Sequence, residues 1–436
     1  MKRSLAYGAA TAAALSLLLA GCSASPSSDG ASGSDATELT YWSMLTVDEP
    51  EVPILTAVFE EFEAETGITV NVQWQGRDVL QKVMAGMTTG NVPDLTDQDN
   101  NRLQGLLANN GAARDLSGLY ERTVEGEDLT IGELIGDKYD PLTKDADGKY
   151  FMLPFTLQPY VWWYNGANVP SLTEAAPSDW AGMNAMLAEL KADGRAPIAL
   201  DADHTDYDRA MVATAIVRAI GPGKLLETVE DPTGEAWDTP EMREAVDLFV
   251  DWAEQGFYAK GYDSSKWPAI QTEWAQNKAD LLFLGGWTPN ETRGYAADDM
   301  EYRAFNFPAV EEGGDTTVPV ALNGFAIPTK AKNPEAAERF LAFLYAKDPM
   351  SKLTNDTLSL TVRSDIPVPA DLQDIRDIVD QNAISGVNDQ VPAVVPNFDT
   401  TVFQPATQAL VTGRLTTDEF IEKMRTEQKQ YWELNG

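Results

Sequence analysis

Cysteine and histidine each occur once in the 436 residues, and their scarcity narrows the possible chemistry. Because Cys22 is the only cysteine, no disulfide can form within the chain, and packing must stabilise the fold. His204 is the only histidine, and the sequence has no Gly-x-Ser-x-Gly or His-Glu-x-x-His motif, which are typical of serine hydrolases and zinc proteases. We therefore expect no enzyme activity, no cofactor and no bound metal.

Basic residues are also few. There are 32 lysines and arginines against 68 aspartates and glutamates, which gives a formal net charge of -36. Such a chain repels phosphates, so we expect neither nucleic acid nor an anionic membrane surface as a partner. We interpret most of this charge as a solvated surface, and a cationic ligand is the alternative that it favours.

Long apolar runs are absent except at the N-terminus. Residues 5–20 are apolar and follow Lys2 and Arg3, but this run is too short to span a bilayer and reads as a signal peptide over residues 1–21. It ends in Leu-Ala-Gly-Cys, which resembles the lipobox of bacterial lipoproteins, so we predict a lipid anchor on Cys22. Residues 22–37 are rich in Ser, Gly and Asp and predict a flexible tether. The expected location is the extracellular face of the cytoplasmic membrane.

Strand and helix patterns alternate after the tether. Residues 39–42 predict a strand, residues 54–65 an amphipathic helix that ends at Gly67, and residues 68–74 a strand with one buried face. Helix start signals recur at Thr239-Pro240 and at Thr416 with Glu419, and an apolar strand precedes Gly285-Gly286. This alternation predicts an α/β fold with mostly parallel sheets covered by helices.

Several segments resemble, in order, a known family. They are residues 39–43, 59–70, 88–94, 148–154, 163–165, 177–180, 286–287, 323–328 and 333–344. Together they are similar to extracellular solute-binding protein family 1 of ABC sugar importers, the maltose-binding-protein-like group. Each motif alone would not identify the family. The resemblance rests on the order in which the motifs follow one another after a lipobox.

This resemblance implies a two-lobe periplasmic-binding-protein fold, class II-like, with hinge crossings and an interlobe cleft. The expected lobes are residues 38–152 plus 320–360 and residues 153–319 plus 361–436. A ligand closes the lobes by hinge motion, and the closed form is recognised by the transmembrane subunits of the permease. We expect a monomer that touches the membrane only through its lipid.

Residues that follow strand ends are the candidates for the ligand site, because strand ends in open α/β sheets face a crevice. A sugar offers an apolar C–H face to aromatic rings and hydroxyls to amides and carboxylates. The predicted ligand-binding residues after strand ends are Trp42, Ser43, Met44, Gln75, Asp99, Asn100, Asp206, Tyr207 and Trp287. The resemblance adds residues next to the two crossings between the lobes, which are Gln158, Tyr160, Trp162, Asn323 and Gly324.

The tryptophans do not all qualify as ligand contacts. Trp287 is the strongest candidate because two glycines leave the backbone open beside it. Trp162 and Trp163 alternate along one strand, so at most one of them faces the cleft, and Tyr160 favours Trp162. Trp252 lies on an amphipathic helix and is expected in the core.

Two other functions remain open at this point. A polyamine or another small cation would suit the acidic surface, with Asp99 and Asp206 beside aromatic faces. A secreted glycan-cleaving enzyme would share the sugar preference, but no spacing singles out a carboxylate pair. The segments at Asp97 and Asp201 start like calcium loops and lack the later glycine and acid of an EF-hand.

Overall fold

The computed structural model describes residues 37–436. The expected signal peptide, Cys22 and the tether up to residue 36 lie outside the described residues. Within the described part, no helix has the length and apolarity needed to cross a bilayer.

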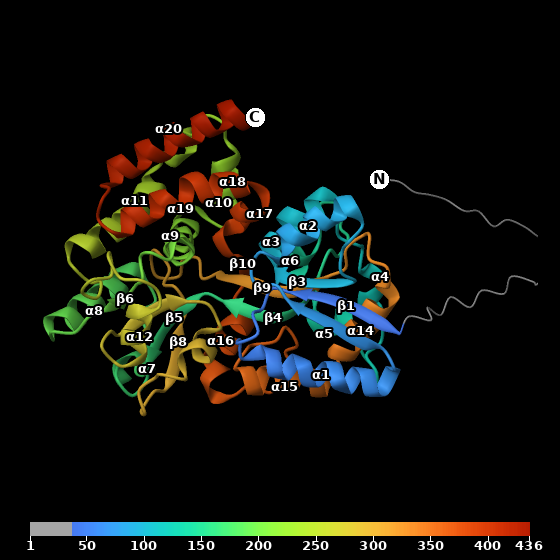
Figure 1. The fold of residues 1–436 in the computed structure, drawn as a ribbon. Helices are drawn as coiled ribbons and strands as arrows, with labels where there is room; N and C mark the ends of the chain where they lie inside the picture. Colours follow the sequence, from blue (N-terminus) through green and yellow to red (C-terminus); the bar gives the residue numbers. More distant parts are fainter. Residues whose placement is uncertain (1–36) are drawn as a thin grey trace, which may run out of the picture. The chain divides into compact units, whose positions relative to one another are not determined.

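The first sheet contains the predicted β-α-β start of the fold (Figure 1). Its order is β10-β9-β3-β1-β2, and β4 pairs with β9 from outside this path. The bounds are β1 (Glu38–Ser43), β2 (Thr69–Trp74), β3 (Leu95–Asp99), β4 (Leu153–Pro159), β9 (Val318–Ala326) and β10 (Ile384–Gly386). Helices α1 (Glu51–Thr66) and α15 (Lys347–Thr357) lie on one side of it, and α2 (Val79–Thr89) lies on the other.

The second sheet has the order β6-β7-β5-β8. Its strands are β5 (Val161–Asn165), β6 (Ile198–Ala199), β7 (Leu281–Leu284) and β8 (Tyr302–Phe305). The larger helices that follow or pack around it are α8 (Trp180–Ala192), α9 (Thr205–Ile220), α11 (Pro240–Glu254), α16 (Ala370–Gln381), α19 (Gln404–Val411) and α20 (Thr417–Asn435).

The sheets are mixed, which corrects the expectation of mostly parallel sheets. Strands β1, β2 and β3 are parallel as predicted, but β9 runs antiparallel to β3 and β4, and β5 runs antiparallel to β7 and β8. Only Tyr160 separates β4 from β5, so the chain passes straight from the first sheet to the second without a crossover helix. The pattern of apolar residues predicts that a segment is a strand, but it does not predict whether that strand runs parallel or antiparallel to its neighbours.

The lobe boundaries stay a prediction, and β10 is the element that bears on them. Residues 361–436 were assigned to the second lobe, yet β10 pairs in parallel with β9 of the first sheet, with Gly386 opposite Val320. The chain leaves this strand through η5 (Val387–Gln390) and continues into α19 and α20.

Helix ends follow the chemistry of the sequence. The Thr416 hydroxyl accepts the N–H of Glu419, and the Glu419 carboxylate accepts the N–H of Thr416, which completes the predicted capping box of α20. Thr239 caps α11 through the N–H of Met242. Gly67 ends α1 with φ of 70°, a left-handed conformation that glycine adopts without a Cβ clash.

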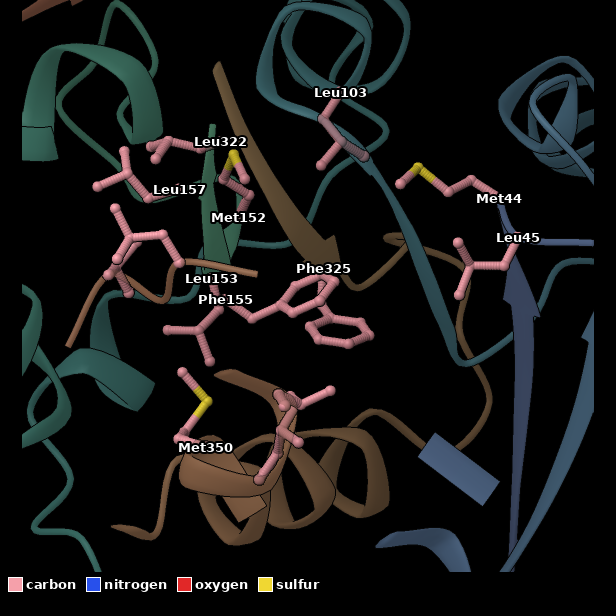
Figure 2. Packing of buried hydrophobic residues seen from close by; sticks show 14 of the residues in the cluster. Met44, Leu45, Leu103, Met152, Leu153, Phe155, Leu157, Leu322, Phe325 and Met350 are labelled. Atoms are coloured by element: carbon pink, nitrogen blue, oxygen red, sulfur yellow. The ribbon is translucent and has the colours of Figure 1, made fainter. Parts of the chain in front are cut away.

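Packing in the core beside the first sheet explains why a glycine stands at position 324 in β9. Figure 2 shows Phe155 and Phe325 side by side, and their ring centroids are 4.7 Å apart. A Cβ on Gly324 would lie 2.1 Å from the terminal methyl of Met152 and 2.8 Å from the carbonyl oxygen of Leu153. Gly324 therefore allows β4 and β9 to approach closely, which explains the glycine by packing, and its contact with a ligand stays a prediction.

Candidate ligand-binding site

Three predicted aromatic residues come together from three separate segments. Tyr160 lies between β4 and β5, Tyr207 in the first turn of α9, and Trp287 just before α13 (Thr288–Thr292). The ring centroids of Tyr160 and Trp287 are 5.4 Å apart, and those of Tyr207 and Trp287 are 6.4 Å apart. All three side chains are half-buried, so each keeps some surface open. We call these three residues the aromatic platform.

Two glycines fix the position of the Trp287 ring. A Cβ on Gly285 would lie 2.0 Å from the indole ring of Trp287, and a Cβ on Gly286 would lie 3.0 Å from Oε1 of Gln158. The indole therefore folds back over Gly285, while Gly286 packs against the end of β4. This is the local reason why Gly-Gly precedes Trp287, as the sequence suggested.

An ion-pair network lies next to Tyr207 on α9. Arg209 pairs with Asp206 at 2.9 Å and also with the buried Asp399. The Gln404 amide donates to Asp206 at 3.1 Å and to Asp399 at 3.0 Å. The Asp206 side chain keeps 42% of its surface exposed, so it has room for a further hydrogen bond.

Glu291 and Gln271 form a second polar group beside the platform. The Gln271 amide donates to Glu291 at 3.0 Å, and Glu291 lies one helical turn after Trp287. Burial raises the pKa of Glu291, while its hydrogen bond with Gln271 and the charge of Arg77 oppose this rise. Neither residue was predicted from the sequence, although Glu291 lies only four residues after Trp287, which was predicted.

A hydrogen bond joins this region to the helix that covers the first sheet. The Asn290 amide donates to Glu51, the first residue of α1, at 2.9 Å. Burial raises the pKa of Glu51. The side-chain oxygen of Asn290 is buried and has no hydrogen-bond partner among residues 37–436.

Asp99 lies close to the ion-pair network, whereas Asn100 has a structural role. Burial raises the pKa of Asp99, and the charges of Arg209 and Asp206 both act on it, so these groups are near one another. Asp99 also accepts the N–H of Arg102 at 3.1 Å. Asn100 is fully buried and accepts the N–H of Leu322 at 3.0 Å, so its amide oxygen links the residue that follows β3 to β9, and its contact with a ligand stays a prediction.

The predicted site residues at the end of β1 form hydrogen bonds or packing contacts with neighbouring residues of the first sheet and its surroundings. The fully buried Ser43 hydroxyl accepts the N–H of Leu45. Met44 is buried, donates its N–H to Asp97 at 2.9 Å, and accepts from Arg77 through its carbonyl. Trp42 is half-buried and packs against the core. These contacts leave Trp42 as the one residue of this trio with surface to offer a ligand.

Three further candidates differ in what they can still bind. The Gln75 amide donates to Gln73 and its oxygen accepts from Lys82, which leaves one N–H and one lone pair of this half-buried side chain. Gln158 is buried, and its Oε1 atom has no hydrogen-bond partner within the described chain. Asn323 is half-buried in β9, opposite Asp99 and Thr156. All three side chains therefore keep hydrogen-bonding capacity, and their contact with a ligand stays a prediction.

Trp162 corrects the choice made between the two neighbouring tryptophans. Its side chain is fully buried, with ring centroids 5.3 Å from Phe283 and 5.9 Å from Trp252. Trp163 is equally buried on the other face, where its indole N–H donates to the carbonyls of Leu284 and Gly285. Strand β5 lies between β7 and β8 with both faces covered, so neither tryptophan is open to a ligand.

Comparison with known proteins places this chain in a family. The family model described as bacterial extracellular solute-binding protein matches residues 57–377. The chain belongs to this family. Its fold is the two-lobe α/β fold of periplasmic binding proteins, as the structural neighbours of this solute-binding protein show.

Several proteins similar to this solute-binding protein are named for sugars. A maltooligosaccharide ABC transporter solute-binding lipoprotein of Streptococcus pneumoniae serotype 4 is 24% identical over 365 residues, which cover 82% of this chain and 79% of the relative. A chitin oligosaccharide binding protein aligns with a TM-score of 0.73 at 19% identity and covers 92% of this chain and 100% of its own. A sugar transporter from Bacillus licheniformis, in complex with stachyose, gives 0.69 at 19% identity over 90% and 99%.

Proposed function

We propose that this chain is the substrate-binding lipoprotein of an ABC importer and captures a sugar or oligosaccharide at the aromatic platform. The observation that supports this proposal most is that the three rings of the platform lie close together. The carboxylates of Asp206 and Glu291 lie beside these rings. Aromatic rings bury the C–H face of a pyranose, and carboxylates and amides pair with its hydroxyls. The names of the relatives support a sugar as the ligand.

The charges around the platform favour a neutral ligand. Burial raises the pKa of Tyr160, and Arg209 and Arg102 are close enough to oppose that rise. Both arginines already pair with carboxylates, Arg209 with Asp206 and Arg102 with Asp99 at 3.5 Å. An anionic sugar would have to break these pairs, whereas the hydroxyls of a neutral sugar can share the remaining carboxylate lone pairs.

The capture cycle is part of the proposal. The lobes close over the sugar by hinge motion, and the closed form docks on the permease while the lipid on Cys22 keeps the protein at the membrane. A polyamine is the second candidate, because Asp206 and Glu291 lie beside aromatic faces that suit a cation. The protein binds its ligand without breaking a bond in it.

Thermal-shift measurements with a sugar panel and spermidine test this function. We expect the unfolding temperature to rise with a neutral sugar, because a ligand that binds only the folded state stabilises it. The Trp287→Ala variant should lose this shift, and Trp432→Ala, which removes a half-buried tryptophan of α20, should keep it.

Two outcomes would contradict the proposal. A shift with spermidine and with no sugar would favour the polyamine. Chromatography that shows the bound glycan cleaved after incubation would make the protein an enzyme.

A further inference from the structure

We infer that Trp267 forms an outer subsite that selects ligands by length, so that an oligosaccharide binds more tightly than a single sugar. This inference rests on the proposed function and extends it to a residue outside the aromatic platform. It starts from the exposure of Trp267, whose side chain keeps 40% of its surface open. Across residues 37–436, it is the only aromatic residue among the exposed large hydrophobic side chains.

A continuous series of ring contacts connects Trp267 to the platform. The centroid of the His204 ring lies 5.7 Å from that of Trp267, and His204 also stacks on Tyr207 at 3.8 Å with an interplanar angle of 15°. The ring centroids of Tyr207 and Trp287 are 6.4 Å apart. A series of neighbouring rings therefore leads from the platform through His204 to an indole that is partly exposed to solvent.

Hydrogen bonds hold the exposed indole in place. The backbone N–H of Trp267 donates to Asp203 at 2.8 Å, and its indole N–H donates to Gln271 at 3.2 Å. Gln271 is buried and also donates to Glu291 beside Trp287. The Gln271 amide thus bridges the Trp267 indole and the Glu291 carboxylate, and a ring that is held before binding loses little entropy when a ligand stacks on it.

This arrangement predicts how affinity depends on ligand length. A monosaccharide on the platform leaves Trp267 in water. A longer chain of sugars can place a further unit on Trp267, which removes the exposed indole face from solvent. Trp267 would then be a specificity-determining residue that contributes only to longer ligands.

Isothermal titration of a homologous sugar series tests the inference. The probes are glucose, maltose, maltotriose and maltopentaose, together with galactose, raffinose and stachyose, titrated into wild type, Trp267→Ala and Trp267→Phe. We expect Trp267→Ala to weaken binding of the longest bound member roughly tenfold and to leave the shortest bound member unchanged. Trp267→Phe keeps a ring and should retain most of the length preference.

The possible failures are distinguishable. If Trp267→Ala leaves every affinity unchanged, or weakens all lengths equally, the outer subsite is refuted while sugar binding by the wild type still stands. If the wild type binds none of these sugars and binds spermidine, both the proposed function and the outer subsite are refuted.

Discussion

Asp97 offers a direct test of how the first sheet supports the residues next to the site. It lies in β3, is fully buried, and accepts the N–H of Met44 at 2.9 Å through one oxygen. Its other carboxylate oxygen has no hydrogen-bond partner among residues 37–436. Burial raises the pKa of Asp97 from 3.8 to about 6. The ionised carboxylate is therefore a cost that the folded state carries at neutral pH.

The size and sign of this cost follow from proton linkage. One pKa unit corresponds to about 1.4 kcal/mol, so a rise from 3.8 to about 6 corresponds to about 3 kcal/mol at neutral pH. Because the folded pKa is above the unfolded value, this contribution destabilises the fold progressively between about pH 4 and pH 6 and stays constant above that range. Asp97→Asn removes the charge and can keep the bond from Met44. We expect it to stabilise the fold by about 2 kcal/mol at neutral pH, since its new amide N–H groups are left without an obvious partner.

Urea unfolding at about pH 4 and about pH 7 measures the effect. The gain of Asp97→Asn should be present at the higher pH and absent at the lower one, where wild-type Asp97 is largely protonated. Asp94→Asn is the matched control, because Asp94 precedes the same strand and accepts hydrogen bonds from Thr40, Lys332 and Asn333, which an amide cannot all replace. It should destabilise the fold. Equal differences between wild type and Asp97→Asn at both pH values would refute the reasoning.

Three further predictions concern the platform, its ion pairs and the anchor. Gly285→Ala should weaken sugar binding at least about tenfold because its Cβ would displace the Trp287 ring, whereas Gly294→Ala, with open space around its Cβ, should not; titration calorimetry compares them. Asp399→Asn should lower the free energy of unfolding by about 2 kcal/mol, because it removes a buried charge partner of Arg209; urea unfolding measures this, and an unchanged value would contradict it. Cys22→Ser should prevent labelling by a fatty-acid analogue and release the protein from the membrane fraction, and membrane retention with full labelling would exclude this anchor.

Local features of the fold were predictable because they depend on residues close in sequence. The capping box of Thr416 and Glu419 and the glycine that ends α1 both require only neighbouring side chains and backbone. Strand direction was not predictable in the same way. The pairing of β9 with β3 and β4 joins segments more than a hundred residues apart, and apolar alternation carries no information about direction.

The same distinction between local and distant residues applies to the candidate site. The room for the Trp287 ring could be anticipated from the two preceding glycines, and its ligand contact stays a prediction. The choice between Trp162 and Trp163 could not, since alternation separates the two faces of β5 but does not tell which face is open, and both are covered. Arg209 was missed because its partner Asp399 lies 190 residues away.

Sugar binding at the aromatic platform is tested by a crystal structure of the protein with the sugar that gives the largest thermal shift. We expect a pyranose ring with its C–H face on Trp287, bordered by Tyr160 and Tyr207. Its hydroxyls should lie within hydrogen-bond distance of Asp206 or Glu291. A sugar bound away from these rings, for example in the groove lined by Trp180, Arg243 and Asp247, would contradict it.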